Sequence, residues 1–103
     1  MIVKEIQYRE TIKPEGSCGT GYSEPSIFFF KGENEGVMIT IDLWYCPVDS
    51  IKRELLKGIV WYCYEHPDFE IENINETFDM FAKVVAHKHC PYSYEEIIDS
   101  NLN

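Results

Sequence analysis

The sequence predicts an α+β fold, with a mostly antiparallel sheet of three or four strands and two or three helices packed on one face. Hydrophobic residues alternate along stretches of the first half of the chain, which is typical of strands. A five-residue segment with glycine at both ends separates two of these stretches, as in a β-hairpin. In the second half, hydrophobic residues recur three and four positions apart, which is typical of a helix. The 103 residues are 45% hydrophobic, which predicts a single packed domain over residues 1–103.

The first expected element is a strand over residues 2–12 with one face exposed to solvent. Its apolar face would hold Ile2, Ile6, Tyr8 and Ile12. Residues 13–25 contain proline and glycine too densely for regular structure, so we expect a loop there.

A β-hairpin is expected next, with strands over residues 26–31 and 37–45 and the glycine-bounded loop 32–36 between them. The second strand would direct Val37, Ile39, Ile41 and Leu43 to the core. Its other face is only partly polar, because it carries Met38, Thr40, Asp42 and Trp44. Either a helix or a partner should therefore cover part of that face.

Pro47 ends the hairpin, and Asp49 or Ser50 can cap a helix that runs to about Lys57. Residues 59–64 then fit two alternatives. Their β-branched and aromatic composition favours a buried strand, which is our expectation. A continued helix would instead form one apolar stripe from Ile51, Leu55, Ile59 and Tyr62.

A second helix is predicted by residues spaced four, three and four positions apart: Ile74, Phe78, Phe81 and Val85. Asn73 with Glu76 three residues later resembles a capping box. Pro91 would stop this helix. Residues 94–100 indicate one more short helical turn, and the asparagine-rich end is expected to fray.

Charge is the strongest functional signal. Eighteen acidic residues outnumber nine basic ones, which gives a net charge of −9. Between Lys57 and Lys83 there is no basic residue, whereas six acids occur: Glu65, Asp68, Glu70, Glu72, Glu76 and Asp79. Such a surface repels nucleic acid and anionic membranes and attracts basic proteins. We therefore expect a basic protein partner and no direct contact with nucleic acid or membrane.

Two kinds of chemical site have candidate residues in the sequence. Thiol and imidazole groups suit zinc, and the candidates are Cys63, His66, His87, His89 and Cys90. Their spacing is irregular, so we expect a zinc-free, cofactor-free protein, with a small zinc-binding regulatory module as an alternative. Cys18 in the glycine-rich loop could act as a nucleophile, but no base and orienting group can be placed beside it. We therefore expect no enzymatic activity.

Two further patterns bear on location. The first residues lack the pattern of a signal peptide, and no apolar run approaches the roughly 20 residues that span a bilayer. These patterns predict a cytoplasmic protein.

The expected partner-binding surface combines acids with neighbouring aromatic residues, since aromatic side chains anchor interfaces and carboxylates steer basic partners. The predicted set is Trp61, Tyr64, Glu65, Asp68, Phe69, Glu70, Glu72, Glu76 and Asp79. The hairpin-tip residues Glu33 and Glu35 are expected to lie on another side of the molecule.

A small acidic α+β domain without catalytic residues resembles the immunity proteins, or antitoxins, of bacterial toxin systems. These include the inhibitors paired with contact-dependent growth inhibition toxins and with nuclease bacteriocins. The resemblance implies a dedicated inhibitor that binds a toxin domain, often a basic nuclease, and blocks its active site or substrate surface. The alternative from the same charge is a nucleic-acid mimic of the anti-restriction or anti-CRISPR type, with carboxylates at phosphate-like spacing.

Overall fold

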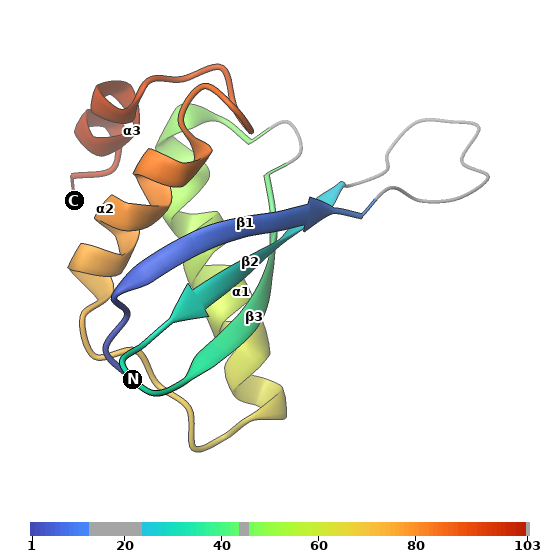
Figure 1. Cartoon of the computed structure of the whole chain (residues 1–103). Coiled ribbons are helices and arrows are strands. Elements are labelled where there is room, and N and C mark those ends of the chain that lie inside the picture. Colours follow the sequence, from blue (N-terminus) through green and yellow to red (C-terminus); the bar gives the residue numbers. More distant parts are fainter. Residues whose placement is uncertain (13–23, 44–45, 103) are drawn as a thin grey trace.

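The structure is a computed structural model and describes residues 1–12, 24–43 and 46–102. The elements in chain order are β1 (Glu5–Thr11), β2 (Pro25–Lys31), β3 (Gly36–Asp42), a short 3-10 helix η1 (Val48–Ser50), α1 (Ile51–Glu65), α2 (Ile74–Val85) and α3 (Tyr94–Ser100). The three strands form an antiparallel sheet in the order β1-β2-β3, and the helices lie on one side of it (Figure 1). The predicted α+β fold is confirmed.

The predicted hairpin is confirmed as β2 and β3. Lys31 pairs with Gly36, so the intervening residues 32–35 form the turn. A side chain at Gly36 would collide with the ring of Phe29, which explains the glycine that begins β3. Residues 13–23 of the expected loop and residues 44–45 of the expected strand lie outside the described residues, and β3 ends at Asp42.

The strand β1 differs from the prediction. It begins at Glu5 rather than Ile2, and its pairing with β2 shifts between Tyr8 and Glu10. Such a bulge inserts one residue and reverses the faces that follow it. Ile6 faces the core, whereas Ile12, which follows the bulge, is exposed. Ile2 lies before the strand and is also exposed, and Tyr8 is 37% exposed, contrary to the predicted alternation.

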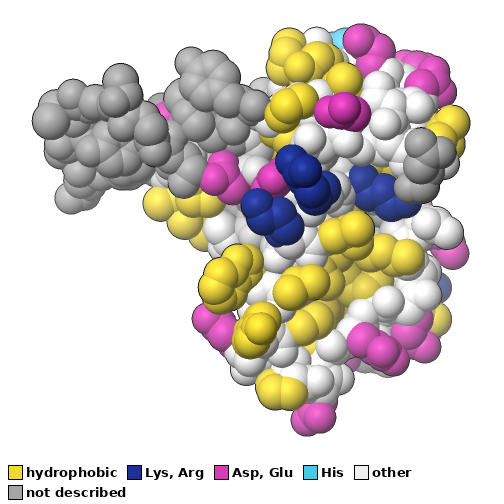
Figure 2. All heavy atoms as spheres, turned by 180° about the vertical axis from the view of Figure 1, so that it is seen from behind, with side chains coloured by type: hydrophobic (Ala, Val, Ile, Leu, Met, Phe, Trp, Pro, Cys, Tyr) yellow, Lys and Arg dark blue, Asp and Glu magenta, His cyan; other side chains and the backbone are white. Residues whose placement is uncertain are grey.

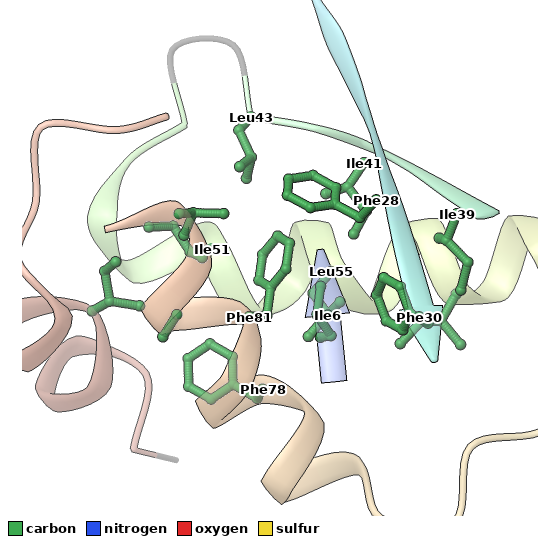
Figure 3. Close-up of a cluster of buried hydrophobic side chains, with 14 of the residues drawn as sticks. Ile6, Phe28, Phe30, Ile39, Ile41, Leu43, Ile51, Leu55, Phe78 and Phe81 are labelled. Atoms are coloured by element: carbon green, nitrogen blue, oxygen red, sulfur yellow. The ribbon is translucent and has the colours of Figure 1, made fainter. Parts of the chain in front are cut away.

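The core lies between the sheet and the helices (Figure 3). Phe28 and Phe30 of β2 are fully buried in it, and the ring of Phe28 meets that of Phe81 of α2 edge to face, with centroids 5.1 Å apart. Phe29, between them in sequence, points to the opposite face of the sheet, where the Arg9 guanidinium lies 4.9 Å from its ring centroid. The run of three phenylalanines is therefore divided between two faces, as the period of a strand requires.

The favoured prediction of a strand over residues 59–64 is wrong, because α1 continues as one helix from Ile51 to Glu65. Ile51, Leu55 and Ile59 are buried along its inner face, so burial of a helical stripe outweighs the β propensity of individual residues. Gly58 lies where α1 crosses β3. A Cβ atom there would be 2.8 Å from the carbonyl oxygen of Thr40, so glycine permits this close crossing.

The predicted apolar face of α2 is confirmed, with Phe78, Phe81 and Val85 buried. The predicted capping box is wrong, because the Asn73 side chain makes no cap hydrogen bond. Instead, its amide accepts a hydrogen bond from the backbone nitrogen of Val3 and donates one to the Val3 carbonyl, both at 2.9 Å. Asn73 thus joins the start of α2 to the segment before β1.

The capping box occurs at α3 instead. The Ser93 side chain accepts from the backbone nitrogen of Glu96, and the Glu96 carboxylate accepts from that of Ser93. The expected fraying after α3 is wrong at Asn101, which is buried. Its side-chain nitrogen donates to the carbonyls of Val48 at 2.8 Å and Ile97 at 2.7 Å, and its oxygen accepts from the backbone nitrogen of Lys52 at 3.3 Å. Asn101 therefore fastens α3 to η1 and to the start of α1.

Replacing Asn101 by alanine is expected to lower the free energy of unfolding by about 1–3 kcal/mol, because buried backbone groups lose their partners. Urea denaturation followed by far-UV circular dichroism measures this change. The matched control is Asn75→Ala, at an exposed position of α2, for which we expect a change within about 0.5 kcal/mol. Equal losses for the two variants would contradict the anchoring role of Asn101.

Candidate functional site

The outer face of α1 carries an exposed hydrophobic surface. Because Ile51, Leu55 and Ile59 fix the inner face of the helix, the residues between them point outward. The exposed fractions of the outward hydrophobic side chains are 38% for Leu56, 55% for Val60, 69% for Trp61 and 77% for Tyr64. These four residues are called the α1 stripe below. The rings of its last two members lie 5.9 Å apart, so they form one aromatic surface.

Basic side chains border the first half of the α1 stripe. Lys52, Arg53 and Lys57 all belong to α1, and they are three of the nine basic residues of the chain. Figure 2 shows Lys and Arg side chains gathered beside a hydrophobic patch on the helical side of the molecule. Lys57 makes an ion pair with Glu54 at 3.4 Å, and the Arg53 guanidinium donates to the Ser50 hydroxyl at 3.3 Å.

Carboxylates gather at the other end of α1. The connection from α1 to α2 and the tip of the β2–β3 hairpin both lie at the end of the molecule where the chain begins (Figure 1). One shallow hollow there is lined by Glu35 together with Glu65 and Asp68, and another by Glu35 together with Glu72. The acidic end, as defined here, consists of Glu33, Glu35, Glu65, Asp68, Glu70 and Glu72. The expectation that the hairpin tip lies on another side of the molecule is wrong.

The N-terminal amine holds part of the acidic end in place. It donates to the carbonyl oxygen of Glu70 at 2.8 Å and lies 3.3 Å from the Glu72 carboxylate. The backbone nitrogen of Glu72 in turn donates to the Met1 carbonyl at 3.0 Å. Glu72 is therefore paired with the N-terminal amine, whereas no ion pair within the described residues involves Glu65, Asp68 or Glu70.

Three residues of the predicted binding set have other positions. Phe69 is half-buried and packs against the ring of Tyr62, with centroids 4.7 Å apart, so it anchors the connection after α1. Asp79 accepts a short hydrogen bond from the Tyr94 hydroxyl and pairs with Lys83 at 3.2 Å. The Tyr94 hydrogen bond lowers the pKa of Asp79, whose contacts join α2 to α3. Glu76 is exposed on the first turn of α2.

A groove of about 470 Å³ runs along α1 and β3 beside their close crossing at Gly58. Met38 and Thr40 line it from the strand, and Lys57 and Trp61 line it from the helix. The partly polar face of this strand was expected to be covered by a helix or by a partner. In the structure α1 lies beside that face, and Met38 remains exposed.

The first pair of candidate zinc ligands has structural contacts. Cys63 lies near the end of α1, and its Sγ donates to the carbonyl of Phe69 at 3.4 Å. The ring of His66 stacks on Tyr62 with centroids 4.1 Å apart, and its Nδ1 lies 3.2 Å from the Tyr62 carbonyl. Both residues therefore help to shape the connection between α1 and α2.

The other candidates follow the end of α2. Cys90 is buried, its Sγ donates to the Val85 carbonyl at 3.5 Å, and burial raises its pKa. His89 packs on the ring of Tyr8, with ring centroids 4.2 Å apart, and burial lowers the pKa of His89. His87 has a φ of 63°, so it forms the left-handed residue of the turn after α2. Among the described residues, no group of three or more His, Cys, Asp or Glu side chains could hold a metal ion.

The candidate nucleophile Cys18 lies outside the described residues. In the part of the chain that the structure describes, no helix has both the length and the apolar character needed to cross a membrane. No protein-family model, curated protein or solved structure matches this chain.

Sequence reasoning identified Trp61, Tyr64 and the acids after them, but it missed how Leu56 and Val60 extend the aromatic pair. A helical reading of residues 56–64 places all four on one face, so the signal was present in the spacing. The expected strand over residues 59–64 separated Val60 from Leu56, which was expected in the preceding helix, so their common face was missed.

Proposed function

We propose that this chain is an inhibitor of the immunity-protein type, which binds a basic toxin domain through the acidic end and the aromatic half of the α1 stripe. A nuclease is the proposed toxin class, in the cytoplasm of the cell that makes the inhibitor. The observation that carries the proposal is that the exposed rings of Trp61 and Tyr64 lie on the last turns of α1, which ends at Glu65 of the acidic end.

The two kinds of side chain have separate physical roles. A nuclease needs basic residues to hold phosphates, so an acidic surface accelerates its encounter with an inhibitor. Exposed aromatic side chains provide affinity once the partner has desolvated them. A nucleic-acid mimic would depend on its carboxylates alone, so loss of binding on aromatic truncation supports the inhibitor and opposes the mimic.

The test begins with capture of the partner from an extract of the native host and its identification by mass. Binding of the purified partner is then measured by surface plasmon resonance. The double variant Trp61→Ala, Tyr64→Ala is expected to raise the off-rate about 30-fold or more, which corresponds to about 2 kcal/mol. An unchanged off-rate would remove the aromatic half of the α1 stripe from the interface.

The contribution of the carboxylates to steering is tested by the rate at which the partner associates with charge-removing variants. Asp68→Asn with Glu70→Gln is expected to slow association several-fold at low salt, by about the same factor as Glu33→Gln with Glu35→Gln, because both pairs lie at the acidic end. The difference in on-rate between these variants and the unchanged protein should shrink as salt shortens the Debye length from about 10 Å at 0.1 M to about 3 Å at 1 M. The matched control is Glu95→Gln with Asp99→Asn on α3, at the opposite end of the molecule (Figure 1). An on-rate that is independent of salt, or an equal effect of the control, would contradict electrostatic steering by the acidic end.

A further inference from the structure

The groove along α1 and β3, called the α1–β3 groove below, has one wall built from a single side of the helix. Four residues of α1 at spacings of four, three and four positions line this wall: Glu54, Gly58, Trp61 and Glu65. Asp42 of β3 lines the opposite wall. The groove volume of about 470 Å³ is within the range of about 300–1,000 Å³ that is usual for small-ligand sites.

The charges around the α1–β3 groove favour a cation. Three carboxylates line it, those of Asp42, Glu54 and Glu65, against one ammonium group, that of Lys57. The Lys57 side chain is 60% exposed and pairs with Glu54 at 3.4 Å, whereas the Glu54 side chain is only 16% exposed. A carboxylate that is largely removed from water interacts more strongly with a cation than a solvated one does.

The ring of Trp61 distinguishes between kinds of cation. It is 69% exposed, and Met38, which is 51% exposed, lines the same groove from β3. A guanidinium group is planar and weakly hydrated, so it can stack on an indole ring while its N–H groups donate to carboxylates around its edge. An ammonium group is compact and strongly hydrated, so it gains less from the same surface.

We infer that the α1–β3 groove is the receptor site for an arginine side chain of the basic partner, with the guanidinium group stacked on Trp61 and held by the carboxylates of Glu54 and Glu65. The source of the arginine rests on the proposed function, whereas the preference of the groove for guanidinium is a property of this chain alone. Because a desolvated ion pair acts mainly on dissociation, loss of Glu54 should raise the off-rate, whereas the pairs of the acidic end tested above act on the on-rate.

The first test uses a small probe and needs no partner. Nuclear magnetic resonance follows the indole N–H signal of Trp61, which Trp61→Phe identifies, while N-acetyl-arginine amide is added to the purified chain. The expected result is a saturable shift with a dissociation constant of about 1–10 mM. The uncharged analogue N-acetyl-citrulline amide should bind at least about tenfold more weakly, and Nα-acetyl-lysine amide at least about threefold more weakly.

Two results of this titration would overturn the inference. One is the absence of saturation by the arginine probe up to about 50 mM, and the other is equal binding of the arginine probe and either analogue.

Variants of the two acidic residues locate the probe. Glu54→Gln and Glu65→Gln should each weaken binding of the arginine probe about threefold or more. The matched control is Glu95→Gln, which makes the same change of charge at an exposed position of α3 and should leave probe binding unchanged. Equal weakening by the control would show that the probe responds to net charge alone and would overturn the site. Far-UV circular dichroism checks that each variant is folded.

The second test uses the captured partner in surface plasmon resonance. Glu54→Gln should raise its off-rate about tenfold and change its on-rate by less than about twofold, and Glu95→Gln should change neither. If Trp61→Ala with Tyr64→Ala releases the partner but Glu54→Gln leaves its off-rate unchanged, the proposed function stands and the arginine site is overturned. If the arginine probe binds selectively but no partner is captured, the groove remains a guanidinium site and the proposed function fails.

Discussion

Replacing Phe28 by alanine is expected to lower the free energy of unfolding by about 3–5 kcal/mol, as for other large-to-small changes of buried aromatic residues. Phe28 is fully buried, and its ring has edge-to-face contacts with Phe81 at 5.1 Å and Tyr8 at 5.9 Å. Small domains are stable by only about 5–15 kcal/mol, so this single change should remove a large part of the total. Urea denaturation followed by far-UV circular dichroism measures it.

The neighbouring residue provides the matched control. Phe29→Ala removes the same atoms from the opposite face of β2, where the side chain is only half-buried. We expect a loss of about 1 kcal/mol, which is typical of point changes in general. If the two alanine variants lose the same stability, the assignment of the two faces of β2 would be wrong.

Replacing Gly58 by valine is expected to destabilise the protein by about 3 kcal/mol, at the upper end of the range for overpacked cores. The added side chain would meet the Thr40 carbonyl and the Ile41 side chain, and a backbone atom cannot rotate out of the way. Gly58→Ala is the more revealing variant, because helix propensity alone would stabilise it by about 1 kcal/mol. We expect it to be destabilised instead.

The control for Gly58 is the preceding residue, whose side chain is exposed. Lys57→Val has the same new side chain on the same helix, and it should cost about 0.7 kcal/mol or less, the propensity difference for valine. Chemical denaturation of the three variants compares them directly. An increase in stability for Gly58→Ala would show that α1 can move away from β3 without a cost in the free energy of unfolding.

Helix α2 could be predicted from the sequence because it has one apolar and one polar face, so the period of its pattern is visible. The hairpin could be predicted from the alternation of Val37, Ile39 and Ile41 and from the loop with glycine at both ends. Helix α1 is different, because it is apolar on both faces over its second half. Ile59 and Tyr62 face inward, and Val60, Trp61 and Tyr64 face outward. Where both faces of a helix are apolar, its period of 3.6 is harder to distinguish, and its aromatic composition then resembles that of a buried strand.

The candidate site was predictable only where it is continuous in sequence. The acids that follow Trp61 and Tyr64 are adjacent along the chain, so they could be recognised from the composition. The proximity of Glu35 to Asp68 depends on how the hairpin meets the connection after α1, and no local pattern reports such a tertiary contact. Likewise, Asp79 appeared to be a surface charge because its partner, Tyr94, belongs to another helix.

The hydrogen bonds between Val3 and Asn73 have a consequence for the order of folding. They join residues 70 positions apart, whereas β2 and β3 pair across a turn of residues 32–35. Closing the longer loop has a larger entropic cost, and contacts repay that cost only after closure. During synthesis, the segment before β1 leaves the ribosome early but meets its partner only after α1 has been made. Secure attachment of this segment is therefore a late step of folding, although the segment is made well before its partner.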